Sequence, residues 1–487
     1  MIELCRQKKR LGIGQEKELI KLAVESLFVN DKSVDSTNLQ SELDNIAGIE
    51  ETHVTENFSY LNVKYKDSQR TYKVDKYGNI AIIKDYDSSP SDLAGTGTKE
   101  DPFKIESIED LITFLIMLNG GNTSLGIEST NFNNQYINLT RNLDCNNDNS
   151  YADPNTKRFS EFLGNKDMTL KEILLSDEYG FFRSNWDSEF NGVLNGEGNT
   201  IGGINYEPTS NKSSMINKNN GTIENININY KYDTQTNNIS GLVSENLGTI
   251  KKCNINIEIN AISLIGGIVK TNSGIIEYCN TYGNINAPGN DIGVITLKNT
   301  EDGIIRYCSN NANIKGSKGG YSFGGIASTN NGLIEECFNK GTITEQYQVI
   351  GGITGNNNGI IKNCYNTAEL KGSWYIGGIT GGVGANAQII NCYNIGKITS
   401  NSSYGTGGLV GNVTVCNNIY NLVCLTGAFS KLAQWTLNET CSFQNEDYFK
   451  SQAILDILNK DMPSNTWVKD NTNINNGYPI LHWEINE

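Results

Sequence analysis

The chain contains little proline, histidine and charge for its length. Seven of its 487 residues are proline, two are histidine, and charged residues make up 19% of the chain. Disordered chains are typically rich in charge and proline, so this composition favours a folded protein. Glycine is abundant instead, with 50 residues, and it recurs with asparagine between short apolar runs. Both residues tolerate a positive φ, which a protein with many strands and turns requires.

Long apolar runs are also missing. A helix that spans a membrane needs about 20 predominantly apolar residues, and the longest apolar run, residues 111–118, is much shorter. Residues 1–10 contain no apolar stretch of the kind that signal peptides have. We therefore expect contact with a membrane only through an N-terminal anchor that this sequence does not contain.

Positive charge is outnumbered, with 39 basic against 54 acidic residues and a net charge of −15. An acidic surface repels phosphate backbones, and no basic patch with interleaved aromatic residues occurs. The sequence therefore predicts no nucleic-acid partner.

A repeated pattern occupies residues 180–430. A Gly-Gly-aliphatic start is followed by Asn-x-Gly-x-Ile-x-x-Cys, and the period between successive cysteines is 26 to 29 residues. Each period has space for about three short strands and no crossover helix. The pattern predicts a mainly β fold, a right-handed parallel β-helix solenoid.

Stacked coils place equivalent residues above one another at about 4.8 Å. We expect one interior column to consist of Ile250, Ile276, Ile305, Ile334, Ile361 and Ile390. A second column consists of Cys253, Cys279, Cys308, Cys337, Cys364 and Cys392. Buried free thiols are the expected state, because cysteine packs as a small apolar residue; some disulfides, or a metal or redox role, are the alternatives. Ile276 and Cys279 are three residues apart, so burying both requires a bend at about Glu277–Tyr278.

The flanks divide the rest of the chain. Residues 1–84 predict a small α+β domain, with a helix at 14–28 followed by a β-meander, and residues 85–94 a polar linker. Residues 95–179 lead into the β-helix and cap it, and Ser107 to Asp110 resembles a capping box that opens a short helix. Residues 431–487 form a C-terminal capping segment.

The segment from Gly351 to Tyr365, GGITGNNNGIIKNCY, resembles the GLUG-motif family, whose repeats occur in large bacterial surface and secreted proteins. Residues 95–105, Trp467 and residues 476–483 are similar to this family's flanking segments. Residues 1–84 are similar to the soluble part of a type IV pilin, although the apolar N-terminal half-helix is absent. The resemblance implies an extracellular or cell-surface location, often with adhesion, and it brings no known active site.

Residues for catalysis are scarce. His53 and His482 both lie outside the repeats; we interpret His53 as solvated and His482 as a packing residue. No cofactor and no metal is expected. The best carboxylate cluster for catalysis or Ca²⁺ binding is Asp291, Glu301 and Asp302, with Arg306 in the same coil.

Aromatic residues recur just before successive Gly-Gly starts. They are Tyr321, Phe323, Tyr347, Trp374, Tyr375 and Tyr404. They either pack at corners of the coil or form a strip on which a ligand stacks.

Three functions remain open. The preferred one is an adhesin-like binding or stalk module without catalysis, monomeric, with a host or environmental glycan or a protein surface as its partner. The alternatives are a polysaccharide lyase or glycoside hydrolase, and a non-catalytic passenger domain of a larger surface protease or toxin.

Overall fold

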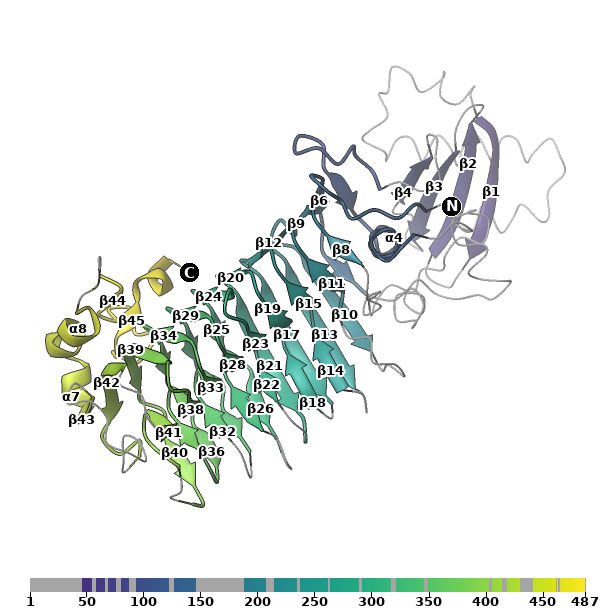
Figure 1. Cartoon of the computed structure of the whole chain (residues 1–487). Coiled ribbons are helices and arrows are strands. Elements are labelled where there is room, and N and C mark those ends of the chain that lie inside the picture. Colours follow the sequence, from purple (N-terminus) through teal and green to yellow (C-terminus); the bar gives the residue numbers. More distant parts are fainter. Residues whose placement is uncertain are drawn as a thin grey trace. The chain divides into compact units, whose positions relative to one another are not determined.

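The structure is a computed structural model of the 487-residue chain (Figure 1). It describes residues 46–86, 93–145 and 188–486, with gaps at 55–57, 66–68, 76–79, 122–126, 207–213, 234–236, 262, 289–290, 317–320, 346–348, 403–404, 414–417, 430–440, 461 and 463–464. The predicted helix at 14–28 lies outside the described residues. Two units are distinguished: the first holds most of the chain up to residue 93, and the second holds the repeats and both of their flanks.

The first unit contains a four-stranded antiparallel sheet in the order β1-β2-β3-β4. Its strands are β1 (Ile46–Val54), β2 (Phe58–Tyr65), β3 (Gln69–Asp75) and β4 (Ile80–Tyr86). The last three contain the runs that the sequence predicted as strands, whereas β1 was not predicted.

The second unit is a parallel β-solenoid, which confirms the predicted fold class. A nine-stranded parallel sheet contributes one strand per coil. Its strands are β8 (Glu189–Phe190), β11 (Ile216–Asn219), β15 (Val243–Asn246), β19 (Val269–Asn272), β23 (Thr296–Asn299), β28 (Ala327–Asn330), β33 (Thr354–Asn357), β38 (Thr380–Val383) and β41 (Val410–Val413). A shorter parallel sheet precedes it in six of these coils and consists of β14 (Asn237–Ser240), β18 (Ser263–Gly266), β22 (Ile292–Gly293), β27 (Ser322–Gly324), β32 (Val349–Gly351) and β37 (Ile376–Gly377).

The remaining strands of the solenoid belong to one large parallel sheet, which has 24 strands among the described residues. They are β5 (Phe103–Ile105), β6 (Tyr136–Leu139), β7 (Leu143–Asp144), β9 (Val193–Asn195), β10 (Thr200–Tyr206), β12 (Thr222–Glu224), β13 (Asn227–Asp233), β16 (Thr249–Lys251), β17 (Asn254–Asn260), β20 (Ile275–Glu277), β21 (Asn280–Asn286), β24 (Ile304–Arg306), β25 (Ser309–Asn310), β26 (Asn313–Lys315), β29 (Leu333–Glu335), β30 (Phe338–Asn339), β31 (Ile343–Thr344), β34 (Ile360–Lys362), β35 (Tyr365–Asn366), β36 (Leu370–Gly372), β39 (Gln388–Asn394), β40 (Ile398–Ser400), β42 (Ile419–Leu425) and β43 (Ser442–Gln444).

The isoleucine column fills the interior as predicted, except at its last member. Ile250, Ile276, Ile305, Ile334 and Ile361 pair in register and are fully buried. Ile361 then pairs with Ile389, and Ile390 pairs with Lys362 on the outer face, so the prediction of Ile390 was wrong. The reason is spacing, because the interior isoleucine always stands three residues before the column cysteine.

The predicted bend between isoleucine and cysteine is present. The residue before each column cysteine has a left-handed backbone, with φ of 53° at Lys252 and Tyr278 and 50° at Glu336. This bend reverses the alternation of the strand, so that both flanking side chains point inward. The Cys279 thiol donates to the carbonyl oxygen of Glu277 (Sγ···O 3.3 Å), which closes the bend. All six column cysteines are buried and free, and burial raises the pKa of the Cys253 and Cys392 thiols.

Buried asparagines form a further column that the sequence reasoning did not anticipate. Its members are Asn219, Asn246, Asn272, Asn299, Asn330 and Asn357, each the last residue of a strand of the nine-stranded sheet. The side-chain Nδ2 of each member except Asn357, the last, donates to the Oδ1 of the asparagine in the next coil at 2.7–2.8 Å. This asparagine column satisfies the polar atoms of the interior and holds the coils in register.

The solenoid begins with a capped apolar helix, α4 (Ile108–Leu118). Ser107 is its N-cap, and its hydroxyl accepts a hydrogen bond from the Asp110 backbone nitrogen at 3.1 Å, in agreement with the predicted capping signal. Phe114 on α4 packs against Phe132 and Phe190, with ring centroids 5.2 and 6.2 Å away. Among the described residues, no helix is long and apolar enough to cross a membrane.

The C-terminal segment covers one side of the last coils. It contains α7 (Glu446–Phe449), α8 (Gln452–Leu458), β44 (Trp467–Val468), β45 (Ile480–Leu481) and the 3-10 helix η4 (His482–Asn486). It packs on a column of stacked rings, Phe338, Tyr365 and Tyr393, whose centroids are 4.9 and 5.0 Å apart. In earlier coils the same position holds Asn254, Asn280 and Ser309. The outer face therefore changes from polar to aromatic where the segment covers it.

Candidate functional site

Two of the predicted strip residues are exposed and share one position of the coil. Tyr321 comes directly before β27, and Trp374 comes two residues before β37. Phe323 of β27 and Ile376 of β37 both pair with Ile350 of β32, and Tyr321 and Trp374 each stand two residues before these partners. They are therefore two coils apart, about 10 Å at the ordinary strand spacing. Tyr321 is 63% exposed and Trp374 is 45% exposed.

The other strip residues lie elsewhere. Phe323 on β27 is fully buried in the solenoid, in a column with Ile292 and Ile350. Its assignment to a ligand-binding strip was therefore wrong. Tyr375 is half-buried, and its ring fills the space beside Gly405, where a Cβ would collide with it. Tyr347 and Tyr404 lie outside the described residues. The structure thus leaves Tyr321 and Trp374 as the exposed described members of the strip.

The predicted carboxylate cluster is not assembled. Asp291 precedes β22, whereas Glu301 and Asp302 follow β23, so two strands separate them along the coil. The Arg306 guanidinium is engaged by Glu277, with Nη2 2.7 Å from Oε2. In the part of the chain that the structure describes, no group of three or more His, Cys, Asp or Glu side chains is placed to hold a metal ion.

Arg306 instead belongs to an outer row in which charge alternates from coil to coil. Lys251 pairs with Glu224 at 2.9 Å, and Lys362 pairs with Glu335 at 2.6 Å. Such partly exposed ion pairs contribute about 0–1 kcal/mol each. The row is a partly exposed, solvated face of the solenoid.

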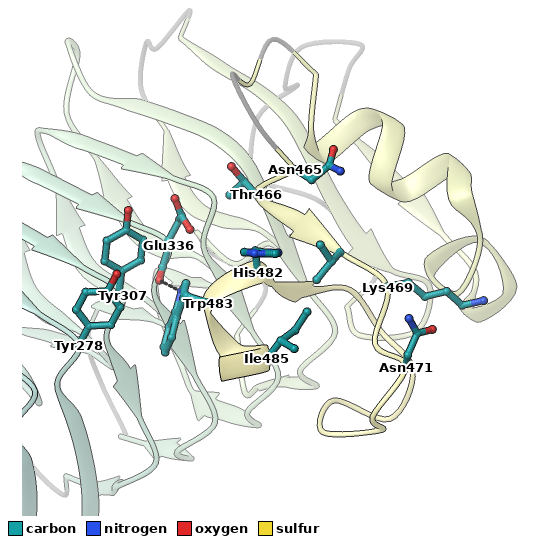
Figure 2. A pocket seen from close by; sticks show the side chains of 11 residues that line it. Tyr278, Tyr307, Glu336, Asn465, Thr466, Lys469, Asn471, His482, Trp483 and Ile485 are labelled. Atoms are coloured by element: carbon teal, nitrogen blue, oxygen red, sulfur yellow. Dashed lines mark hydrogen bonds between the residues drawn. The ribbon is translucent and has the colours of Figure 1, made fainter. Parts of the chain in front are cut away.

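A cavity of about 620 Å³ lies between the repeats and the C-terminal segment. Tyr278, Tyr307 and Glu336 line it from the solenoid, and residues between 465 and 485 line it from the other side, among them Lys469, Asn471 and His482 (Figure 2). His482 is exposed at this cavity, so its interpretation as a packing residue was wrong. Its neighbours Leu481 and Trp483 are buried in its place.

Aromatic rings form one wall of the cavity. The Tyr278 and Tyr307 rings stack with centroids 4.7 Å apart and an interplanar angle of 21°. Trp483 meets both edge-on, at 6.3 and 6.2 Å. The Trp483 indole Nε1 donates to the carbonyl oxygen of Glu336 at 3.0 Å, which connects the C-terminal segment to the repeats.

Glu336 contributes the carboxyl group that lines the cavity from the repeats. Burial raises the pKa of its carboxyl to about 7, and the neighbouring charge of Glu335 adds to the effect. The sequence reasoning missed Glu336, Tyr278 and Tyr307. The sequence did contain a signal for them. All three stand directly before a column cysteine, a left-handed position at which later coils have the better-suited Asn363 and Asn391.

Comparisons with known proteins return little. No model of a protein family matches the chain, and no curated protein matches it. The resemblance to GLUG-motif repeats and to pilins therefore remains an expectation. One solved structure that matches is described as an IgA1 protease, with a TM-score of 0.41 and 12% identity over 84% of this chain and 28% of that chain. The chain spans less than a third of that protein's length, and a likeness at this level supports no inference about activity.

Proposed function

We propose that the chain is an adhesin-like binding module that acts outside the cell, with a glycan or a protein surface as its partner. The observation that carries the proposal is the exposure of Tyr321 and Trp374 at one position of the coil, two coils apart. Exposed aromatic side chains combine a large apolar face with a polar edge, and such residues dominate binding energy at recognition surfaces.

The scaffold suits this role because it holds the two rings at a fixed separation. Parallel strands in register connect the three coils, and in the first step the Asn330 side chain also donates to Asn357 at 2.8 Å. A pair of rings that is already ordered loses little conformational entropy when a ligand binds. An extended, repetitive partner could contact both rings at once.

The test is binding of the full chain to an array of immobilised polysaccharides and extracellular proteins. The double variant Tyr321→Ala, Trp374→Ala is expected to bind about tenfold more weakly or worse, since each buried aromatic anchor contributes on the order of 1–2 kcal/mol. The matched control is Tyr282→Ala, which removes a tyrosine of 44% exposure from β21 in the large sheet. Unchanged affinity of the double variant for every array ligand that wild type binds would overturn the proposal.

A further inference from the structure

The cavity between the repeats and the C-terminal segment is separate from the Tyr321 and Trp374 strip and is lined by different residues. Its volume of about 620 Å³ falls within the range of about 300–1,000 Å³ typical of small-molecule sites. We propose that this cavity binds a short neutral saccharide of one or two rings. The proposal does not rest on the function proposed for the strip.

The stacked tyrosines supply the apolar surface that a saccharide requires. Tyr278 and Tyr307 are both only partly buried, so part of each ring remains accessible from the cavity. The C–H face of a sugar ring packs on such a surface, while its hydroxyls point to the sides. Because the two rings stack in successive coils, each covers one face of the other, and the apolar surface open to the cavity is made of atoms of both rings.

Polar groups surround this platform. Asn465, Asn471 and Thr466 offer amide and hydroxyl groups that both donate and accept hydrogen bonds, which matches the dual character of sugar hydroxyls. His482 and Glu336 add a ring nitrogen and a carboxyl. Lys469 is the one cationic side chain among the lining residues, and no arginine lines the cavity. Phosphate ligands favour arginine forks or several cations, so the lining favours a neutral ligand over a phosphorylated one.

The lining is held in place before any ligand arrives. The His482 backbone nitrogen donates to the Thr466 carbonyl oxygen at 2.9 Å, and Trp483 is tied to Glu336 at 3.0 Å. The loop after Lys469 is closed by the Asp470 carboxylate, which accepts backbone hydrogen bonds from Ile474, Asn475 and Gly477 at 3.1, 2.8 and 3.0 Å. A preformed site binds with a small entropy cost.

The experiment measures binding of neutral mono- and disaccharides to the full chain by saturation-transfer NMR, followed by calorimetry for those that bind. The probes are glucose, galactose, mannose, N-acetylglucosamine, cellobiose and lactose, with glucuronic acid and glucose 6-phosphate as charged counterparts. At least one neutral sugar is expected to bind more tightly than both charged probes. Absence of binding by all six neutral sugars, or a preference for a charged probe, would overturn the proposal.

Variants then place the binding in the cavity. The double variant Asn471→Ala, His482→Ala alters two exposed side chains and leaves the backbone bond of His482 to Thr466 intact. It is expected to weaken sugar binding about tenfold or more, since each lost hydrogen bond is worth about 0.5–1.5 kcal/mol. Tyr420→Ala, a tyrosine on β42 outside the cavity, is the matched control. Equal sugar affinity of wild type and the double variant would show that the sugar does not bind in this cavity.

A pH series adds a readout specific to Glu336. Lys469 and His482 face Glu336 across the cavity, and Glu335, Arg306 and Lys362 lie beside it on the sheet. The protonated carboxyl donates to a sugar oxygen, so wild-type affinity is expected to fall severalfold from pH 6 to pH 9.

Glu336→Gln keeps a donor at both pH values and is expected to remove this fall. The same pH dependence in wild type and Glu336→Gln would contradict the role of Glu336. If Tyr321→Ala, Trp374→Ala lost sugar binding and the cavity variants did not, the sugar would bind at the exposed aromatic pair, and the proposal for the cavity would be wrong.

Discussion

The Tyr365 hydroxyl donates a hydrogen bond of 2.8 Å to the Glu484 carboxylate, although the two residues are 119 positions apart. Both are buried, and Glu484 also accepts a hydrogen bond of 2.8 Å from the Leu481 backbone nitrogen. Lys340 lies 3.8 Å from the same carboxylate. The contact fixes the C-terminal segment to the aromatic column, and with it one wall of the cavity.

Glu484→Ala is expected to destabilise the protein by about 2–3 kcal/mol, because it leaves the buried Tyr365 hydroxyl without its acceptor. Urea unfolding followed by tryptophan fluorescence measures the effect, since Trp467 and Trp483 lie in the segment concerned. Glu446→Ala is the control: its exposed carboxylate pairs with Lys450 one turn along, and its loss is expected to cost less than about 0.5 kcal/mol. Equal losses in the two variants would contradict the importance of the Tyr365 contact.

Asn330→Ala tests the asparagine column. Asn330 is fully buried, donates to Asn357 at 2.8 Å and accepts from Asn299 at 2.8 Å. Its removal leaves polar atoms of both neighbours unsatisfied, so the free energy of unfolding is expected to fall by about 2–4 kcal/mol. Asn331→Ala, one residue along on the outer side, is expected to change it by less than about 0.5 kcal/mol. If the asparagine column did not stabilise the protein, Asn330→Ala and Asn331→Ala would have similar melting temperatures.

Lys252→Asn is expected to stabilise the protein. Lys252 is exposed and has φ of 53°, a conformation that costs most residues about 1–2 kcal/mol but that asparagine tolerates. A gain of about 0.5–1 kcal/mol is expected, and Lys252→Val is expected to cause a loss because a branched Cβ crowds the left-handed backbone. Thermal unfolding of wild type, Lys252→Asn and Lys252→Val measures these differences. A Val variant as stable as the Asn variant would show that the bend is not strained.

Glu336 is expected to make stability depend on pH. Its pKa is raised from 4.5 to about 7 in the folded protein, mainly by burial. The folded state therefore holds the proton more tightly than the unfolded chain, and the free energy of unfolding falls as the pH rises from 5 to 8. Because the carboxyl is partly exposed, we expect a fall of about 1–2 kcal/mol rather than the full value implied by the shift. Urea unfolding at pH 5 and pH 8 measures this difference in the free energy of unfolding, and Glu336→Gln is expected to remove it. An equal difference in wild type and variant would show that other groups cause it.

Much of the solenoid follows from local rules. The constant interval between Ile276 and Cys279 required a bend, and Tyr278 adopts it with a left-handed backbone. The interval also identifies Ile389 rather than Ile390 as the interior residue, which the spacing to Cys392 already implied. The asparagine column was equally present in the Asn-x-Gly repeats, but a turn residue gives no sign by itself that its side chain points inward.

The candidate sites were predicted less well, because exposure depends on what covers a surface. Phe323 and Tyr321 are two residues apart, but Phe323 lies in β27 and pairs with the buried Ile292 and Ile350, whereas Tyr321 precedes the strand and is exposed. The carboxylates Asp291 and Asp302 are close in sequence, but β22 and β23 keep them apart.

The coil follows from the repeated residues. The period, the isoleucine and cysteine columns and the bend before each column cysteine recur from coil to coil, and stacking at a fixed spacing turns each recurring residue into a column. The tertiary structure alone decided where the C-terminal segment lies. Its contacts with Phe338, Tyr365 and Tyr393 join residues about a hundred positions apart, and no periodicity relates the two partners. The cavity beside Tyr278, Tyr307 and Glu336 depends on that packing, because eight of its eleven lining residues belong to the segment.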